Sequence, residues 1–295
     1  MLIKLMKIVV FLSGGLGNQM FQYALYASLK NQGYNAKVDI GLLNKDTQHN
    51  GYELDTIFGI HANSNIFDLF LVRCMYYLHI WKPNTIINFW KKLFQFLRIT
   101  FITDKTQDFT RIKNDNIVYF CGYFQSAKYF NNLKHISSIF KFQEETISQQ
   151  SKEILSLITQ CNSISIHIRR GDYISENNKN LYGGICTKEY YQKAIDIMCS
   201  KVANPHFFIF SNDIEWCKKN IKLPHIYYVN SNQGKDSWQD MFLMSKCKHN
   251  IIANSTFSWW GAYLNKNPQK IIISPSKLTN RGDSPELFPD YWIKL

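Results

Sequence analysis

Short apolar runs alternate with helix-like stretches along most of this chain, and this alternation constrains the fold more than any other feature. In the second half the pattern predicts a strand at 163–168, a helix at 188–202 and a strand at 206–211. Further strands are predicted at 7–12, 36–40, 116–121, 226–229, 250–253 and 270–273, and helices at 16–32, 144–159, 236–245 and 255–264. Strands that alternate with helices are typical of parallel sheets with right-handed crossovers. We therefore predict an α/β fold with two Rossmann-like domains facing a cleft.

A polar stretch near 142–152 separates the two sets of elements. We place the boundary there and predict domains at 1–145 and 146–295. The chain has 295 residues, of which 45% are hydrophobic, so it can bury two ordinary cores. A cleft between two such domains is the expected ligand site.

The charge balance narrows the choice of partners. The net charge is +12, with 16 basic and 10 acidic residues in 1–145 and 18 and 12 in 146–295. Because the excess is even and forms no basic arm, we predict no nucleic-acid partner. An anionic small ligand or an anionic membrane surface suits this balance. The stretch 66–102 mixes aromatic and basic residues; we favour an ordinary pair of core helices, with an amphipathic helix on a membrane as the alternative.

The cysteines and the amino terminus indicate the compartment. Seven scattered cysteines without a C-x-x-C pair argue against a disulfide framework or a zinc site and favour a reducing compartment. The first 12 residues are too short to span a membrane and contain no small-residue cleavage site. No later segment offers about 18 uncharged apolar residues. We predict a cytoplasmic protein, with peripheral contact at the inner membrane face as the alternative.

The predicted strand at 163–168 leads into His167, Arg169, Arg170 and Asp172. Open α/β sheets bind ligands at the carboxyl edge of their strands, and a guanidinium can donate two hydrogen bonds to one phosphate. We predict that Arg169 binds phosphate, that Arg170 pairs with a carboxylate such as Asp172, and that His167 holds a nucleotide or is a satisfied core histidine. A surface ion pair that caps the strand is the alternative for the whole run.

A second polar segment, Asn254, Ser255 and Thr256, follows the strand at 250–253, and Phe257 begins an apolar run. Such residues cap helices, and a helix amino terminus with nearby hydroxyls binds anions. A plain cap above a tryptophan-filled core is the alternative.

Two acidic residues extend the predicted site. Asp213 follows the strand at 206–211, and Asp240 lies early in the helix at 236–245. We predict that both accept hydrogen bonds from a base or a ribose, although Asp240 could instead complement the helix dipole. Together with the two motifs above, they place a phosphorylated ligand on the second half of the chain.

Glycines at 14, 15 and 17 follow the first predicted strand. With Asp39 roughly 20 residues later they mimic a nicotinamide dinucleotide fingerprint. Met20 stands where that fingerprint needs a small residue, so an NAD(P)-dependent epimerase or dehydrogenase is kept only as an alternative. We interpret Asp39 as a strand-end residue that faces water.

Three motifs in this order resemble those of the α-1,2-fucosyltransferases of glycosyltransferase family 11. They are Gly14-Gly15-Leu16-Gly17-Asn18-Gln19-Met20-Phe21-Gln22, His167-x-Arg169-Arg170-Gly171-Asp172 and Asn254-Ser255-Thr256-Phe257-Ser258-Trp259-Trp260. The resemblance runs from about residue 8 to the carboxyl terminus, but we can match nothing in the family to 66–106. It implies a GT-B fold with an acceptor-side first domain and a GDP-sugar-binding second domain. It also implies inverting transfer of L-fucose from GDP-β-L-fucose to the 2-hydroxyl of a terminal β-galactose, with another linkage as the alternative.

The same resemblance implies residue roles. Gly15 and Gly17 would let the backbone approach the sugar phosphate, and Asn18 would lie near the reaction centre. Gln19 and Gln22 are weaker candidates that could simply cap and solvate the helix. The full set expected to bind the donor is His167, Arg169, Arg170, Asp172, Asp213, Asp240, Asn254, Ser255, Thr256, Phe257, Gly15, Gly17, Asn18 and Gln19.

The expected mechanism has one gap. Departure of GDP builds negative charge on the β-phosphate, and the chain contains no D-x-D cluster that would hold a metal there. Arg169 and the helix start at 254–257 can neutralise that charge instead, so we predict that no metal or cofactor is needed. Asp39, Glu53, Asp55 and Asp172 are available as general bases, and the sequence ranks none above the others. The expected acceptor is a β-galactoside-terminated oligosaccharide or lipid-linked glycan, by analogy an O-antigen-like repeat or lipopolysaccharide.

Overall fold

The computed structural model describes residues 6–43, 49–80, 90, 92–104, 116–133, 136–282 and 286–295. The chain divides into two compact units, Met1–Lys141 and Phe142–Leu295. Phe142 belongs to the second unit because its ring stacks on Trp238 and meets Phe242 edge-on, at centroid distances of 5.9 and 5.5 Å. The boundary predicted at 145 lies just inside this second unit.

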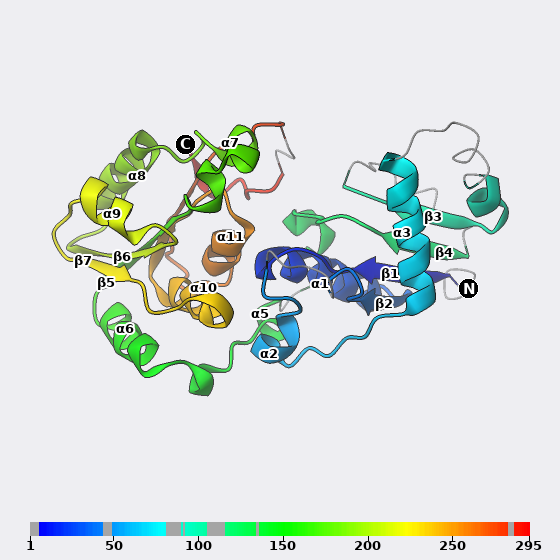
Figure 1. Ribbon diagram of the computed structural model, residues 1–295. Coiled ribbons are helices and arrows are strands. Elements are labelled where there is room, and N and C mark those ends of the chain that lie inside the picture. Colours follow the sequence, from blue (N-terminus) through cyan, green and yellow to red (C-terminus); the bar gives the residue numbers. More distant parts are fainter. Residues whose placement is uncertain are drawn as a thin grey trace. The chain divides into compact units, whose positions relative to one another are not determined.

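The first unit is built on a parallel sheet with strand order β2-β1-β4-β3 (Figure 1). Its strands are β1 (Lys7–Phe11), β2 (Asn35–Asp39), β3 (Ile99–Ile102) and β4 (Ile117–Phe120). Its helices include α1 (Leu16–Asn31), α2 (Leu54–Phe58), α3 (Ile66–Ile80) and α5 (Ile136–Ile139), with a 3-10 turn at Ala127–Tyr129. Alternate residues of β1 enter two cores, because Ile8 and Val10 pack toward α1 whereas Val9 and Phe11 pack toward α3. Both faces of the sheet are covered, which explains why β1 is apolar along most of its length.

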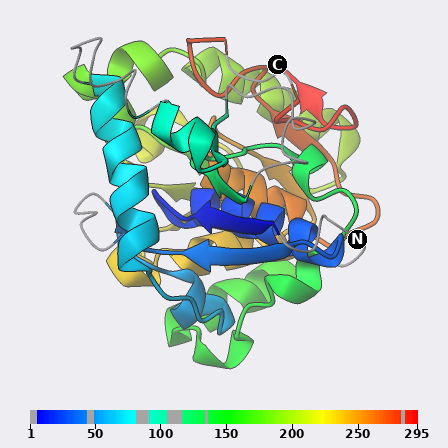
Figure 2. The ribbon, with the colours of Figure 1, turned by 90° about the vertical axis from the view of Figure 1, so that its right-hand side faces the viewer.

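The stretch 66–102 only partly matches the favoured pair of helices. Its first part is a helix, α3, which Figure 2 shows along one side of the sheet. The prediction is wrong at Ile99–Ile102, which is strand β3 and pairs in parallel with β4. Residues 81–89 lie outside the described part of the chain. Among the described residues, no helix has the length and apolarity needed to cross a membrane.

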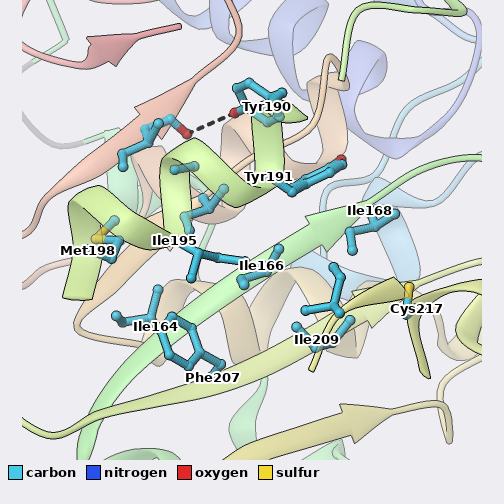
Figure 3. Close-up of a cluster of buried hydrophobic side chains, with 14 of the residues drawn as sticks. Ile164, Ile166, Ile168, Tyr190, Tyr191, Ile195, Met198, Phe207, Ile209 and Cys217 are labelled. Atoms are coloured by element: carbon cyan, nitrogen blue, oxygen red, sulfur yellow. Dashed lines mark hydrogen bonds between the residues drawn. The ribbon is translucent and has the colours of Figure 1, made fainter. Parts of the chain in front are cut away.

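The second unit is built on a parallel sheet with strand order β10-β9-β8-β5-β6-β7. Its strands are β5 (Asn162–Ile168), β6 (Pro205–Ser211), β7 (Ile226–Val229), β8 (His249–Ile251), β9 (Ile272–Ser274) and β10 (Ile293–Lys294). Its helices are α6 (Gln149–Thr159), α7 (Glu176–Tyr182), α8 (Lys188–Lys201), α9 (Ile214–Asn220), α10 (Trp238–Lys246) and α11 (Thr256–Tyr263). Figure 3 shows the core on one face of this sheet, where Ile164 and Ile166 of β5 and Phe207 of β6 pack against Ile195 and Met198 of α8. This core holds β5 rigidly at the centre of the sheet.

The predicted elements agree with the structure to within two residues at their ends, with one exception. The helix predicted at 144–159 starts late, because Glu144–Thr146 is a 3-10 turn and α6 begins at Gln149. The hydroxyl of Ser148 fixes that start by accepting a hydrogen bond from the Ser151 N–H at 3.1 Å. The short elements α7, α9 and β10 were not predicted, because so few residues carry little periodic signal.

Candidate active site

The carboxyl edge of the second sheet carries a cavity of about 570 Å³. Its walls come from the segments that follow β5, β6 and β7, together with the starts of α10 and α11. The residues that matter below are His167, Arg169, Asn212, Asn232, Asp240 and Phe257. Five of the residues predicted from the sequence are therefore within or beside one cavity: His167, Arg169, Asp172, Asp240 and Phe257. This is the edge at which parallel α/β sheets bind ligands.

His167 is the last-but-one residue of β5 and is only 7% exposed. Its ring lies 5.8 Å from that of Phe257, and its Nδ1 has no hydrogen-bond partner among the described residues. Burial, and then the charge of Arg169, lower the pKa of His167 to about 3, so the imidazole is neutral. The alternative of a satisfied core histidine is wrong for this atom. A buried nitrogen without a hydrogen-bond partner is costly, which makes this histidine unusual among the described residues.

Arg169 forms a forked ion pair with Asp172. Its Nε and Nη2 donate to the two carboxylate oxygens at 3.1 and 2.8 Å, and its guanidinium lies 5.2 Å from the Tyr173 ring centroid. A guanidinium has five N–H donors, so this pair leaves donors free for an anion. Burial of the Asp172 carboxyl is outweighed by its bond to Arg169, and its pKa is below the usual range. Arg169 is thus held as a fixed cation at the cavity wall.

Arg170 pairs with a carboxylate, as predicted, but the partner is Asp213 and not Asp172. Its Nε donates to Asp213 at 3.2 Å, and its guanidinium lies 4.2 Å above the Trp216 ring. Arg169 and Arg170 are consecutive after β5, yet their side chains reach different partners. Asp213 also caps α9 by accepting from the Trp216 N–H at 3.2 Å. Both residues have structural partners, and a role in ligand binding is untested.

Asn212 is a cavity residue that follows β6 in the sequence beside Asp213 but was not among the residues predicted to bind the donor. Its Oδ1 accepts from the backbone N–H groups of Arg170 and Gly171 at 2.9 and 3.2 Å. A Cβ on Gly171 would come within 2.8 Å of the Asn212 Nδ2. The glycine lets the loop after β5 lie directly on the loop after β6, and Asn212 holds it there. The only available signal was the position of Asn212 directly after a strand.

Asn254 does not offer its side chain to a ligand, which corrects the prediction. It is buried, and its Nδ2 donates to the carbonyl oxygens of Tyr182 and Leu278 at 3.2 and 3.0 Å. Its backbone carbonyl accepts from the Tyr173 hydroxyl at 3.0 Å. Asn254 therefore ties together three segments beneath α11. Ser255 is the N-cap of α11 and Thr256 its first residue, and their predicted phosphate contacts stay predictions.

Asp240 is largely enclosed at the start of α10. Asn232 donates to its Oδ1 at 2.7 Å, and the Ser151 hydroxyl orients that amide by donating to the Asn232 Oδ1 at 3.1 Å. Burial raises the pKa of Asp240 to about 7, and the bond from Asn232 only partly opposes this rise. Asp240 is therefore a carboxyl that titrates near neutral pH at a cavity wall, which is frequent at functional sites.

The glycine turn belongs to the first unit, where it is held by two glutamines. Gln19 is buried; its Nε2 donates to the carbonyls of Gly14 and Gly51 at 2.8 Å each, and its Oε1 accepts from the Glu53 N–H. Gln22 bonds in the same way to Ser13 and to the Gly122 carbonyl. The view that these residues solvate the helix is wrong, because both are buried, and both N–H groups of the Gln19 amide are used inside the unit. They are internal clamps of the turn.

Other residues of the turn keep their predicted roles untested. Gly14 has φ +72°, and a Cβ there would lie 2.9 Å from the Asn18 Nδ2, so glycine is required. Asn18 accepts from the Gln125 Nε2 at 2.8 Å. Gly15 is the N-cap of α1 and Gly17 lies in its first turn.

Two of the proposed bases are buried. Asp39 does not face water, because its oxygens accept from the N–H groups of Gly41 and Asn65 at 2.9 and 2.8 Å inside the unit. Glu53 accepts from the Asn50 Nδ2 at 3.0 Å, and burial raises its pKa above the usual range. Asp55 pairs with His61 at 2.7 Å, and Asp172 is bound by Arg169. The four carboxylates have different surroundings, and the identity of the general base stays a prediction.

Comparisons with known proteins agree with the motifs. An E. coli alpha-1,2-colitosyltransferase is 34% identical over 98% of this chain and 98% of its own length. The E. coli O-antigen biosynthesis glycosyltransferase WbnK is 32% identical, over 96% and 99%. Human galactoside alpha-(1,2)-fucosyltransferase 1 is 32% identical over 34% of this chain and 28% of its own length.

Among solved structures, the fucosyltransferase NodZ from Bradyrhizobium superposes with a TM-score of 0.49 at 11% identity, over 88% of this chain and 92% of that one. The model of the family described as glycosyl transferase family 11 matches residues 65–290, which include the cavity and both of its motifs. This chain belongs to glycosyl transferase family 11.

Proposed function

We propose that this protein transfers L-fucose from GDP-β-L-fucose to the 2-hydroxyl of a terminal β-galactose, with inversion and without a metal. The observation that carries the proposal is the cavity that joins a fixed cation, Arg169, to a neutral histidine and a titratable carboxyl, His167 and Asp240. A nucleoside diphosphate sugar needs those complements: positive charge for its phosphates and polar acceptors for its base and ribose. Because the chain belongs to a glycosyl transferase family, we no longer keep the alternative of an NAD(P)-dependent epimerase or dehydrogenase.

Arg169 has the leading role in this proposal. As the bond between fucose and GDP breaks, negative charge grows on the β-phosphate, and a preorganised cation lowers the barrier most. Asp172 fixes the Arg169 side chain by a forked pair, so little ordering is needed when the donor binds. Ser255 and Thr256 at the start of α11 add hydroxyls, and the helix contributes its free N–H groups. The proton of the acceptor hydroxyl goes to a base that we leave unassigned.

Base and ribose would be bound on the other side of the cavity. Asp240 as a carboxylate accepts two N–H or O–H groups, and guanine presents two N–H donors on one edge. His167 and Phe257 line the same cavity and add an imidazole and an aromatic ring. This arrangement favours a purine that has two adjacent N–H groups, such as guanine, over a purine that lacks them.

A second candidate donor is suggested by the E. coli colitosyltransferase, which aligns with nearly the whole chain. Colitose is fucose without its 3-hydroxyl, so the same cavity could accept the GDP ester of either sugar. A site that hydrogen-bonds a hydroxyl rejects the analogue lacking it by about 10⁴-fold, whereas a site without such a bond discriminates weakly. The ratio of the two rates therefore reports whether a residue of this chain binds the 3-hydroxyl.

The test is turnover of GDP-fucose and GDP-colitose, with GDP-mannose as a control, on β-galactosides with a free or a methylated 2-hydroxyl. The proposal expects fucose transfer that disappears when the 2-hydroxyl is blocked. If fucose transfer continued on the methylated acceptor, GDP-fucose would still be the donor but the linkage to the 2-hydroxyl would be wrong. If only GDP-colitose were consumed, GDP-colitose would take the place of GDP-fucose as the proposed donor. If none of the three nucleotide sugars were consumed, the proposal would be overturned.

A further inference from the structure

One side of α3 exposes large apolar residues. Ile66, Phe67 and Phe70 are 87, 61 and 55% exposed, although the opposite side of the same helix is buried in the core. Helical spacing places these three on one stripe together with Arg73, since residues three and four apart share a side. A soluble surface rarely gathers phenylalanines in this way without a partner.

A second segment adds to this layer. Residues 92–96 are helical, and Phe94 is buried in the same core cluster as Leu71 and Val72 of α3. Both helices therefore lie on the same face of the first sheet, as Figure 2 also shows. Phe96 is 83% exposed and Leu97 42%, so they point away from that core. We call the outward residues Ile66, Phe67, Phe70, Arg73, Phe96, Leu97 and Arg98 the α3 layer.

The charges of this layer have one sign. The sequence from 60 to 104 contains only two acidic residues, and both are used inside the unit. Asp68 is fully buried and accepts from two lysines and a tyrosine. Asp104 accepts from the backbone N–H groups of Tyr123 and Phe124 at 2.9 and 2.6 Å. Among the described residues of this stretch, the lysine and arginine side chains are Arg73, which is half-buried, and Lys92 and Arg98, which are exposed.

We propose that the α3 layer docks the protein on the surface of an anionic lipid bilayer. Aromatic side chains would enter the headgroup region, and the flanking arginines would meet the lipid phosphates. A second copy of the chain is a poorer occupant. A two-fold interface brings the same patch of both copies together, so cations would face cations with no carboxylate between them. The proposal is independent of the sugar that the protein transfers.

The test is co-sedimentation of the full chain with phosphatidylcholine vesicles, with and without phosphatidylglycerol. We expect binding to the anionic vesicles at low salt that weakens at high salt, because exposed charges are then screened. Phe67→Ser/Phe70→Ser should weaken partitioning at least tenfold, and Arg73→Gln/Arg98→Gln by about fivefold for each cation removed. These residues are at the surface, so both variants should keep the wild-type unfolding temperature to within a few degrees.

Matched controls come from the second unit. Tyr291 is 71% exposed and Lys152 is also exposed, so Tyr291→Ser and Lys152→Gln remove the same kinds of group elsewhere and should leave binding unchanged. Three results would overturn the proposal. They are no binding to anionic vesicles at low salt, equal losses in the control variants, and a wild-type dimer that Phe67→Ser/Phe70→Ser converts to a monomer.

Discussion

At the scale of single residues, the two arginines after β5 share their chemistry and differ in their partners. Arg169 gives two of its donors to Asp172 and keeps others at the cavity wall. Arg170 is stacked on Trp216 and bound to Asp213 outside the cavity lining. The sequence places both beside the ligand edge, but it cannot say which one turns toward the cavity, because that depends on chain direction after the strand.

Because of this difference, we expect one alanine variant to lose mainly activity and the other to lose mainly stability. Arg169→Ala should lower kcat/KM for GDP-fucose by about 10²–10³, the range for losing one transition-state donor, with unfolding nearly unchanged. Arg170→Ala should lower the unfolding temperature and reduce kcat/KM less than tenfold. Steady-state kinetics and thermal unfolding check both. A loss below fivefold in a folded Arg169→Ala protein would contradict its role.

We expect the protonation state of Asp240 to affect folding stability and GDP binding in opposite directions. Burial raises its pKa from 3.8 to about 7, so the folded protein holds a proton that the unfolded chain has lost between these pH values. Stability from this group therefore falls as pH rises through the window, by up to about 4 kcal/mol. Asp240→Asn removes that loss and can still accept from Asn232. The variant should be more stable than wild type, by an amount that grows between pH 4 and 7.

Donor binding should respond to the same substitution in the other direction. If the carboxylate accepts from the base, wild-type affinity for GDP rises with pH until about 7, and Asp240→Asn is weaker and flat with pH. Calorimetry across this range, with chemical denaturation at each pH, provides both readouts. A variant that is more stable and binds GDP as well as wild type would show that Asp240 has no part in binding.

At the scale of elements, strands β5 to β9 were predictable because each lies in a short run rich in β-branched or aromatic residues. β7 has the predicted bounds and β5 begins one residue early. Strand β3 was not predictable, because Ile99–Ile102 follows an aromatic and basic stretch that resembles a helix. The hydrogen bonds of the buried polar side chains could not be predicted from the sequence either. Asn254 is saturated by carbonyls at Tyr182 and Leu278, and sequence separation hides partners that the fold brings together.

The loop after β5 yields a prediction at this scale. Gly171→Ala forces a Cβ to 2.8 Å from the Asn212 amide that holds the loop. We expect about tenfold weaker GDP binding, because Arg169 loses its fixed position, with only about 1 kcal/mol of stability lost. Asn212→Ala should have a similar effect. The double variant should be little worse than either single one, and fully additive losses would show that the two residues act separately.

At the scale of the whole molecule, the two units are built on similar sheets but differ in the partners of their polar turns. Each is a parallel sheet with both faces covered, and each carries a polar turn after its first strand. In the first unit the turn is saturated internally by Gln19 and Gln22. In the second unit the end of β5 and the turn after it place His167 and Arg169 in the lining of a cavity. The family motif alone did not distinguish these cases, because glycine, asparagine and glutamine suit both.

That division leads to a prediction for the whole enzyme. The sequence contains no D-x-D pair, and the proposal assigns the charge on the leaving phosphate to Arg169 and the start of α11. Activity with GDP-fucose should therefore survive excess EDTA, with less than a twofold loss, and added magnesium or manganese should not raise it. The matched control is Arg169→Ala: if a metal shared the role of the arginine, divalent ions would partly rescue this variant. Abolition of wild-type activity by EDTA, restored by either ion, would mean that the phosphate charge is met by a metal and that Arg169 serves mainly to hold Asp172.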